Sequence, residues 1–171
     1  GPEQIESVIN QIYKFNGPVY VRQNRADRFY DKNELKDFEI GKCYVEKEGK
    51  DIAIFSCGLM VGESLKAAKL LNEEGINAYV INVSTIKPLK DPLICDIVNE
   101  CTYFITAENH SVIGGLGDAI ASFLNENKVQ YFHSKVGLND IFAEGASTDY
   151  LMKQYQMNFE SIYKTSIDLI K

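Results

Sequence analysis

Three apolar runs, separated by segments of helical periodicity, constrain the fold of this chain more than any other feature. The runs cover residues 52–57, 78–83 and 103–107. A continuous apolar run of this length is typical of a strand buried on both faces of a parallel sheet. Parallel neighbours need crossover connections, which are right-handed and usually helical. The sequence therefore predicts an α/β fold, a three-layer sandwich with a mostly parallel central sheet.

Helical spacing is clearest after the first of these runs. Val61, Leu65, Ala68 and Leu71 share one helical face, and Gly75 is placed to end the helix. Weaker patterns predict further strands at 42–48 and 129–132, and further helices at 5–15, 93–98, 119–124, 148–155 and 159–170.

The first 37 residues differ in character from the rest. After the amphipathic helix at 5–15, Asn16-Gly17-Pro18 forms a break, and Val19–Val21 is predicted to be a short strand ending on Arg22. Residues 23–37 are polar and aperiodic, as in a linker. Gly1-Pro2 is typical of a cleaved tag. We predict an N-terminal segment at 1–22, a linker at 23–37 and one domain at 38–171.

Charge and hydropathy exclude several classes of protein. The 18 basic and 24 acidic residues among 171 leave a net charge of −6, which disfavours general binding to nucleic acid or anionic membranes. No apolar stretch approaches the roughly 18 residues of a membrane span, and the N-terminus does not resemble a signal peptide. A cytoplasmic protein is expected.

The cysteines do not form a metal-binding pattern. Cys43, Cys57, Cys95 and Cys101 include no Cys-x-x-Cys pair, and the chain has only two histidines. Buried thiols are therefore favoured over a zinc site.

A glycine-rich turn at 113–117 follows a predicted strand and opens a helix. Such a turn could hold a phosphate on backbone N–H groups. Because neither a dinucleotide fingerprint nor a P-loop is present, a tight turn with close helix packing is favoured.

Glu108-Asn109-His110 follows a predicted strand at the edge where α/β proteins usually bind ligands. Glu108 and His110 could act as acid and base. With no nucleophile beside them, a hydrogen-bonded loop or an interface pair is favoured. His133 has no carboxylate near it in sequence and is predicted to lie at the surface or in an interface.

Arg22, Arg25 and Arg28 form a basic cluster in an acidic chain. Arginine suits bidentate contacts with phosphate. A solvated charged loop explains the same spacing equally well, so both interpretations stay open.

Together, several motifs resemble those of transketolase-like enzymes, over nearly the whole chain and in the same order. The resemblance is greatest to the C-terminal part of transketolases, including separately encoded C-terminal subunits. Deoxyxylulose-phosphate synthase and the β subunit of 2-oxoacid dehydrogenases are similar over the same region. The motifs that carry it are at 17–22, 38–42, 51–60, 85–89, 106–110, 113–117, 136–142 and 144–145.

This resemblance implies part of a transferase that moves a two-carbon ketol unit between sugar phosphates, using thiamine diphosphate and a divalent metal such as Mg²⁺. Two of the family's three domains bind the cofactor, and only residues 3–22 resemble the tail of one, the pyrimidine-binding domain. Gly117-Asp118-Ala119 does not match the family's Gly-Asp-Gly motif. The chain alone is expected to bind no cofactor and to be inactive.

The resemblance also implies one site residue and two kinds of partner. Arg22 matches an arginine that contacts the substrate phosphate, whereas Arg25 matches a second arginine found more in the synthase branch. The expected partners are the N-terminal transketolase domains or subunit, with a homodimer in the full enzyme. The alternatives are the C-terminal domain of a deoxyxylulose-phosphate synthase and a purely structural dimerisation module.

Overall fold

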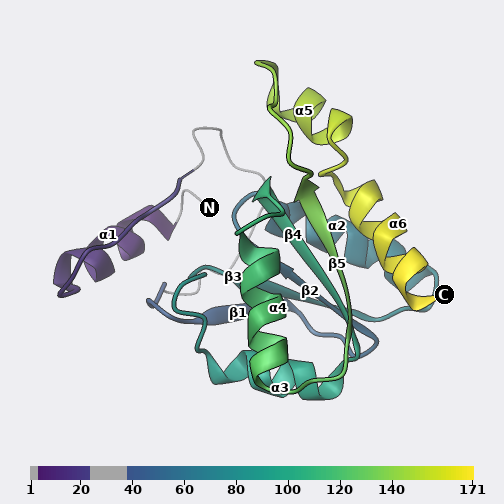
Figure 1. The fold of residues 1–171 in the computed structure, drawn as a ribbon, viewed down its shortest axis with the longest axis horizontal. Helices are drawn as coiled ribbons and strands as arrows, with labels where there is room; N and C mark the ends of the chain where they lie inside the picture. Colours follow the sequence, from purple (N-terminus) through teal and green to yellow (C-terminus); the bar gives the residue numbers. More distant parts are fainter. Residues whose placement is uncertain (1–3, 24–37) are drawn as a thin grey trace.

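The computed structural model describes residues 4–23 and 38–171. It is an α/β fold with a five-stranded sheet in the order β1-β3-β2-β4-β5, in which only β1 runs antiparallel to its neighbour (Figure 1). The predicted fold class is therefore confirmed. The strands are β1 (Cys43–Lys47), β2 (Ile52–Ser56), β3 (Ala78–Val83), β4 (Tyr103–Ser111) and β5 (Phe132–Leu138). The helices are α1 (Ile5–Lys14), α2 (Met60–Glu73), α3 (Pro92–Glu100), α4 (Leu116–Glu126), α5 (Thr148–Gln154) and α6 (Phe159–Ile170).

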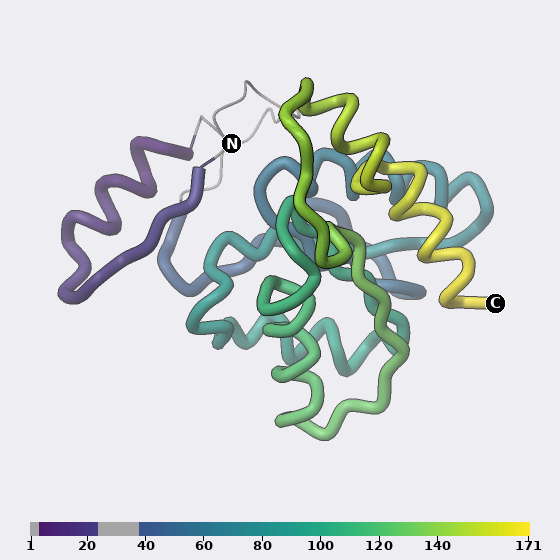
Figure 2. The backbone as a smooth tube through the Cα atoms, turned by 45° about the horizontal axis from the view of Figure 1, so that its top comes forward, coloured from purple at the N-terminus to yellow at the C-terminus, as the bar shows by residue number. Residues whose placement is uncertain are grey.

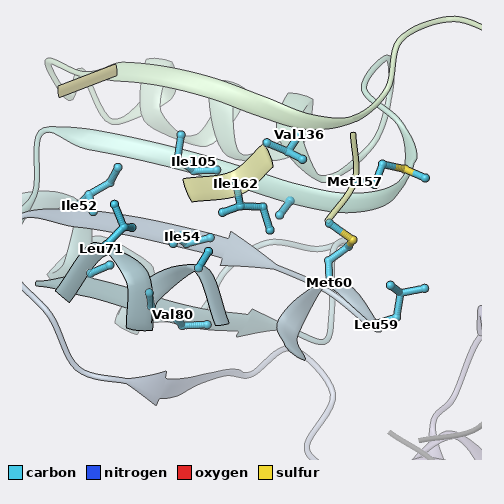
Figure 3. Packing of buried hydrophobic residues seen from close by; sticks show 14 of the residues in the cluster. Ile52, Ile54, Leu59, Met60, Leu71, Val80, Ile105, Val136, Met157 and Ile162 are labelled. Atoms are coloured by element: carbon cyan, nitrogen blue, oxygen red, sulfur yellow. The ribbon is translucent and has the colours of Figure 1, made fainter. Parts of the chain in front are cut away.

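The sheet is buried on both faces, as the apolar runs predict. Every residue of β2 and β3 is buried. On one face, Ile52 and Ile54 pack in a cluster with Met60 and Leu71 of α2 and Ile162 of α6 (Figure 3). On the other face, alternate strand residues pack in a second cluster that includes side chains of α3 and α4. The three layers follow from this alternation of side chains along each strand.

Local signals in the sequence set several helix ends. Asp91 precedes α3 and accepts a hydrogen bond from the Leu93 N–H at 3.1 Å, while Pro92 occupies the first turn. Gly75 follows α2 with φ at +80°, the conformation that glycine adopts without steric cost.

Two predicted strands are wrong. Residues 19–21 are extended, but they pair with no strand among the described residues and their side chains are exposed. The last strand is β5, which begins at Phe132 and not at residue 129. Its ladder with β4 begins where Tyr103 pairs with Phe132, so the residues at 129–131 have no partner in β4.

The N-terminal segment stands apart from the packed body (Figure 2). Helix α1 buries none of its residues, although Ser7 is hydrogen bonded to the backbone of Phe38. Most of the predicted linker, at 24–37, lies outside the described residues, so the predicted domain boundaries remain predictions.

Candidate functional site

The topology singles out one edge of the sheet for a site. Strand β2 lies between β3 and β4, and the helices that follow β2 and β4, α2 and α4, cover opposite faces of the sheet. The connections that leave β2 and β4 therefore diverge at the carboxyl ends of these strands. In open α/β sheets, ligands bind at such a switch point.

At this edge, the carboxylate of Glu108 holds the first turn of α4. Glu108 is only 1% exposed, and its two oxygens accept hydrogen bonds from the Leu116 N–H at 2.7 Å and the Gly117 N–H at 2.8 Å. These are N–H groups without a partner inside the helix, and a negative charge there is stabilised by the helix dipole. Glu108 thus acts as an internal anion at the start of α4.

The glycines of the turn make this arrangement possible. A Cβ atom on Gly115 would lie 1.9 Å from Oε2 of Glu108, and one on Gly117 would lie 2.7 Å from the Lys135 side chain. The N–H of Gly114 donates to Asp118 at 2.5 Å. Because side chains of the protein already bind these backbone groups, the structure favours the packing interpretation of the turn over phosphate binding.

Asp118 and Lys135 form an ion pair across the start of α4. Lys135 donates to the carboxylate of Asp118 and also to the Val112 carbonyl oxygen at 3.2 Å. The hydrogen bond from Lys135 is the main cause that lowers the pKa of Asp118. Sequence reasoning missed this pair because the two residues are 17 positions apart and belong to different elements.

His133, predicted to lie at the surface or in an interface, is partly buried. Its Nε2 atom lies 3.0 Å from the hydroxyl of Thr106, a buried residue of β4, and its ring packs beside Tyr131. Burial, with a contribution from the Lys135 charge, lowers the pKa of His133 to about 4. The ring is therefore neutral near pH 7 and serves as a packed hydrogen-bonding group.

His110 and Glu108 do not form an acid and base pair. Both lie within β4, which extends beyond the predicted run to Ser111. Glu108 is buried beneath α4, whereas His110 is exposed. The interpretation favoured by the sequence is a hydrogen-bonded loop or an interface pair. The structure places both residues in a strand and not in a loop, although the Glu108 carboxylate is hydrogen bonded to α4, and the interface pair stays a prediction.

Arg22 lies near the same edge of the sheet. It is exposed, and its charge acts on Cys57, the residue that directly follows β2. Burial raises the pKa of the Cys57 thiol to about 11, Glu108 adds to the increase, and Arg22 opposes it. Arg25 and Arg28 lie outside the described residues.

The cysteines are free thiols. Cys43 and Cys101 are buried and Cys57 and Cys95 are partly buried. Within 4–23 and 38–171, no group of three His, Cys, Asp or Glu side chains could hold a metal ion. None of the helices in these ranges is long and apolar enough to cross a membrane.

Comparison with protein families gives a match over most of the folded body. Residues 41–162 match the model of the transketolase C-terminal domain. The chain belongs to the transketolase C-terminal domain family. The resemblance inferred from the motifs is thereby confirmed.

Relatives of this transketolase C-terminal domain include separate polypeptides. The chain is 36% identical over 168 residues to a Methanocaldococcus jannaschii protein assigned as a transketolase C-terminal section, covering 97% of this chain and 52% of that protein. It is 37% identical over 163 residues to the 6-deoxy-6-sulfo-D-fructose transketolase subunit of Clostridium sp. (strain MSTE9), with coverages of 95% and 50%. The chain thus spans about half the length of these two relatives.

Other matches extend beyond two-chain enzymes. The 1-deoxy-D-xylulose-5-phosphate synthase of Caldanaerobacter subterraneus subsp. tengcongensis is 36% identical over 155 residues, which are 90% of this chain and 25% of that enzyme. A solved split-gene transketolase, described as an inactive β4 tetramer, superposes with a TM-score of 0.85 at 33% identity. That match covers 96% of this transketolase C-terminal domain and 55% of the solved chain.

Proposed function

We propose that this chain is the C-terminal part of a thiamine-diphosphate-dependent transketolase that moves a two-carbon ketol unit between sugar phosphates. The observation that carries the proposal is the match, along nearly the whole chain, to transketolase C-terminal sections and subunits. Since sugar phosphates are charged metabolites of the cell interior, the proposed location is the cytoplasm.

The cofactor site is proposed to lie on other domains. The described residues do not fit thiamine diphosphate with Mg²⁺: they contain no cluster of three or more His, Cys, Asp or Glu side chains that could hold the metal, and Glu108 already occupies the start of α4. The N-terminal domains or subunit of the transketolase would supply that site, in a full enzyme that forms a homodimer. The split-gene neighbour is described as inactive in a β4 assembly, which supports the proposal that this chain alone is inactive.

Arg22 is the proposed contribution of this chain to substrate binding. It is exposed near the carboxyl edge of the sheet, where its guanidinium group can bind a phosphate in two-point contact. Binding a phosphate away from the reacting carbonyl would help to orient the substrate.

Reconstitution with the N-terminal domains or subunit of the transketolase (the N-terminal half) tests the proposal. We expect ketol transfer only when this chain is combined with the N-terminal polypeptide or domains, and no heat of thiamine diphosphate binding to this chain alone in calorimetry. Tight cofactor binding by the chain alone would contradict the assignment of the cofactor site.

A second candidate rests on the synthase match. In that case the reconstituted enzyme would release 1-deoxyxylulose 5-phosphate in place of ketol-transfer products. If neither reaction is restored although the complex forms, a purely structural or dimerisation role is the remaining interpretation.

A further inference from the structure

The loop between β5 and α5, residues 139–147, exposes large apolar side chains. Phe142 has a relative exposure of 105% and Ile141 of 48%. Ile113, in the turn after β4, is 62% exposed. Clustered apolar side chains in solvent are typical of a surface that contacts another protein.

This apolar loop is held by contacts with the body. Glu144 accepts a hydrogen bond from the Tyr155 hydroxyl, and Ser147 caps α5 by accepting from the Tyr150 N–H at 3.4 Å. At its other end, the Leu138 carbonyl oxygen accepts from the Val112 N–H at 2.9 Å, which joins the loop to the turn that carries Ile113. In Figure 1 the loop extends beyond the tip of β5. These hydrogen bonds restrain the loop backbone, so the backbone loses less conformational entropy when the loop binds a partner.

The charge of the loop indicates which kind of partner binds it, a second copy of this chain or a different polypeptide. Residues 139–149 contain Asp140, Glu144 and Asp149 and no basic residue. In a symmetric contact between two copies with this loop on the two-fold axis, the loop would face its own copy and place like charges together. A different polypeptide, with an apolar recess bordered by Lys or Arg, fits the loop better.

The loop is at the same end of the sheet as Cys57, on which the Arg22 charge acts. Arg22 acts on Cys57 at the carboxyl end of β2, and the loop follows the carboxyl end of β5. Just before Arg22, Tyr20 is 88% exposed, and Ile9 on α1 is exposed as well. A partner that covered this end of the sheet would bury the apolar loop.

We infer that Phe142 is the anchor by which this chain binds the N-terminal half of its transketolase, in an apolar recess with a basic rim. The inference rests on the proposed function, because it takes that half as the partner. Ile141 and Ile113 flank the anchor, and Asp140 faces the basic rim.

The test measures binding of this chain to the separately purified N-terminal half of the same transketolase by titration calorimetry. Phe142→Ala is expected to weaken the complex by at least roughly 30-fold, the scale of an interface hot spot. Phe132→Ala is the matched control, since Phe132 is exposed at the opposite end of β5 and should change the affinity by less than about twofold. Thermal unfolding of both variants would show that each is folded.

The charge of the loop has its own test. Added salt should weaken the wild-type complex, and Asp140→Asn should reduce that dependence. Asparagine suits the positive φ of 49° at this position, so the loop should keep its shape.

The outcomes distinguish a failure of the inference about Phe142 from a failure of the proposed function. If the wild-type chain binds the N-terminal half and Phe142→Ala binds equally well, the anchor is wrong and the proposed partner stands. If the wild-type chain does not bind, both are wrong. If Phe142→Ala instead abolishes self-association in sedimentation velocity, the occupant is a second copy and the inference is overturned.

Discussion

Oε2 of Glu108 lies 1.9 Å from the position that a Cβ atom on Gly115 would occupy. Position 115 must therefore be glycine while Glu108 is present. Any side chain there would displace the carboxylate that binds the first turn of α4. The glycine is required here for space and not for an unusual backbone conformation, since its φ of −98° is accessible to any residue.

Gly115→Ala is expected to destabilise the protein by about 2–4 kcal/mol, because a buried carboxylate would lose its hydrogen bonds. The free energy of unfolding in urea would measure this loss. Gly145→Ala is the control, since nothing lies within 4 Å of a Cβ atom at that position. Equal effects of the two substitutions would show that the hydrogen bonds from α4 to Glu108 contribute little to stability.

Glu108→Gln should destabilise the protein by roughly 1–3 kcal/mol, because an amide of the same shape loses the charge and turns an NH₂ group toward a backbone N–H. Urea unfolding would again give the value. Glu160→Gln is the matched control, an exposed acidic residue in the first turn of α6, where only a few tenths of a kcal/mol are expected. A Glu108→Gln variant as stable as the wild type would contradict the role of Glu108 as an internal anion.

The stability of the protein should fall as His133 becomes protonated. Burial lowers the pKa of His133 to about 4 in the folded state, against 6.5 for the unperturbed group, so the unfolded chain binds the proton more tightly between these values. Stability is therefore fully present above pH 6.5 and is lost as the pH falls toward 4. The loss assigned to this ring is roughly 2 kcal/mol, less than the full pKa difference implies, because the ring is only partly buried.

His133→Gln isolates this contribution, because glutamine can bond to Thr106 but does not titrate. Carboxylates titrate in both proteins, so the readout is the difference between their unfolding free energies from pH 4 to 7. A difference that stays constant over this range would contradict the assigned role of His133.

Arg22→Ala should weaken the use of phosphorylated substrates by the reconstituted enzyme by roughly 1.5–3 kcal/mol, the scale of a charged hydrogen bond. The measurement is the ratio of kcat/KM for a sugar phosphate to that for its dephosphorylated analogue. Arg22→Lys is expected to restore only part of the loss, because an ammonium group cannot make the two-point contact. If both substrates lose activity equally, Arg22 is a structural residue.

The parts of the fold that could be predicted are the strands and helices whose formation depends on residues close together in the sequence. The runs at 52–57 and 78–83 predicted β2 and β3 because a strand buried on both faces must be apolar throughout. Spacing and Gly75 predicted α2 and its end. The weaker pattern at 129–132 misplaced β5, an edge strand whose polar residues His133, Ser134 and Lys135 do not show its alignment with β4.

The site was less predictable because its contacts join residues that are distant in the chain. Nothing near Glu108 in sequence indicates that its oxygens meet the N–H groups of Leu116 and Gly117, although the order of strand, glycine turn and helix is visible. The strand predicted at 19–21 has the right composition, but a strand also needs a neighbour to accept its hydrogen bonds, and the described residues supply none.

The sequence by itself determined the layered α/β fold and the family, because periodicity and ordered motifs are properties of the chain alone. Tertiary structure alone decided that Glu108 accepts hydrogen bonds from the first turn of α4 and that His133 is neutral near pH 7. Hydrogen-bond partners and burial depend on which elements are packed together. It likewise decided that Phe142 projects into solvent, because whether an apolar side chain is buried depends on what lies over it and not on its own chemistry.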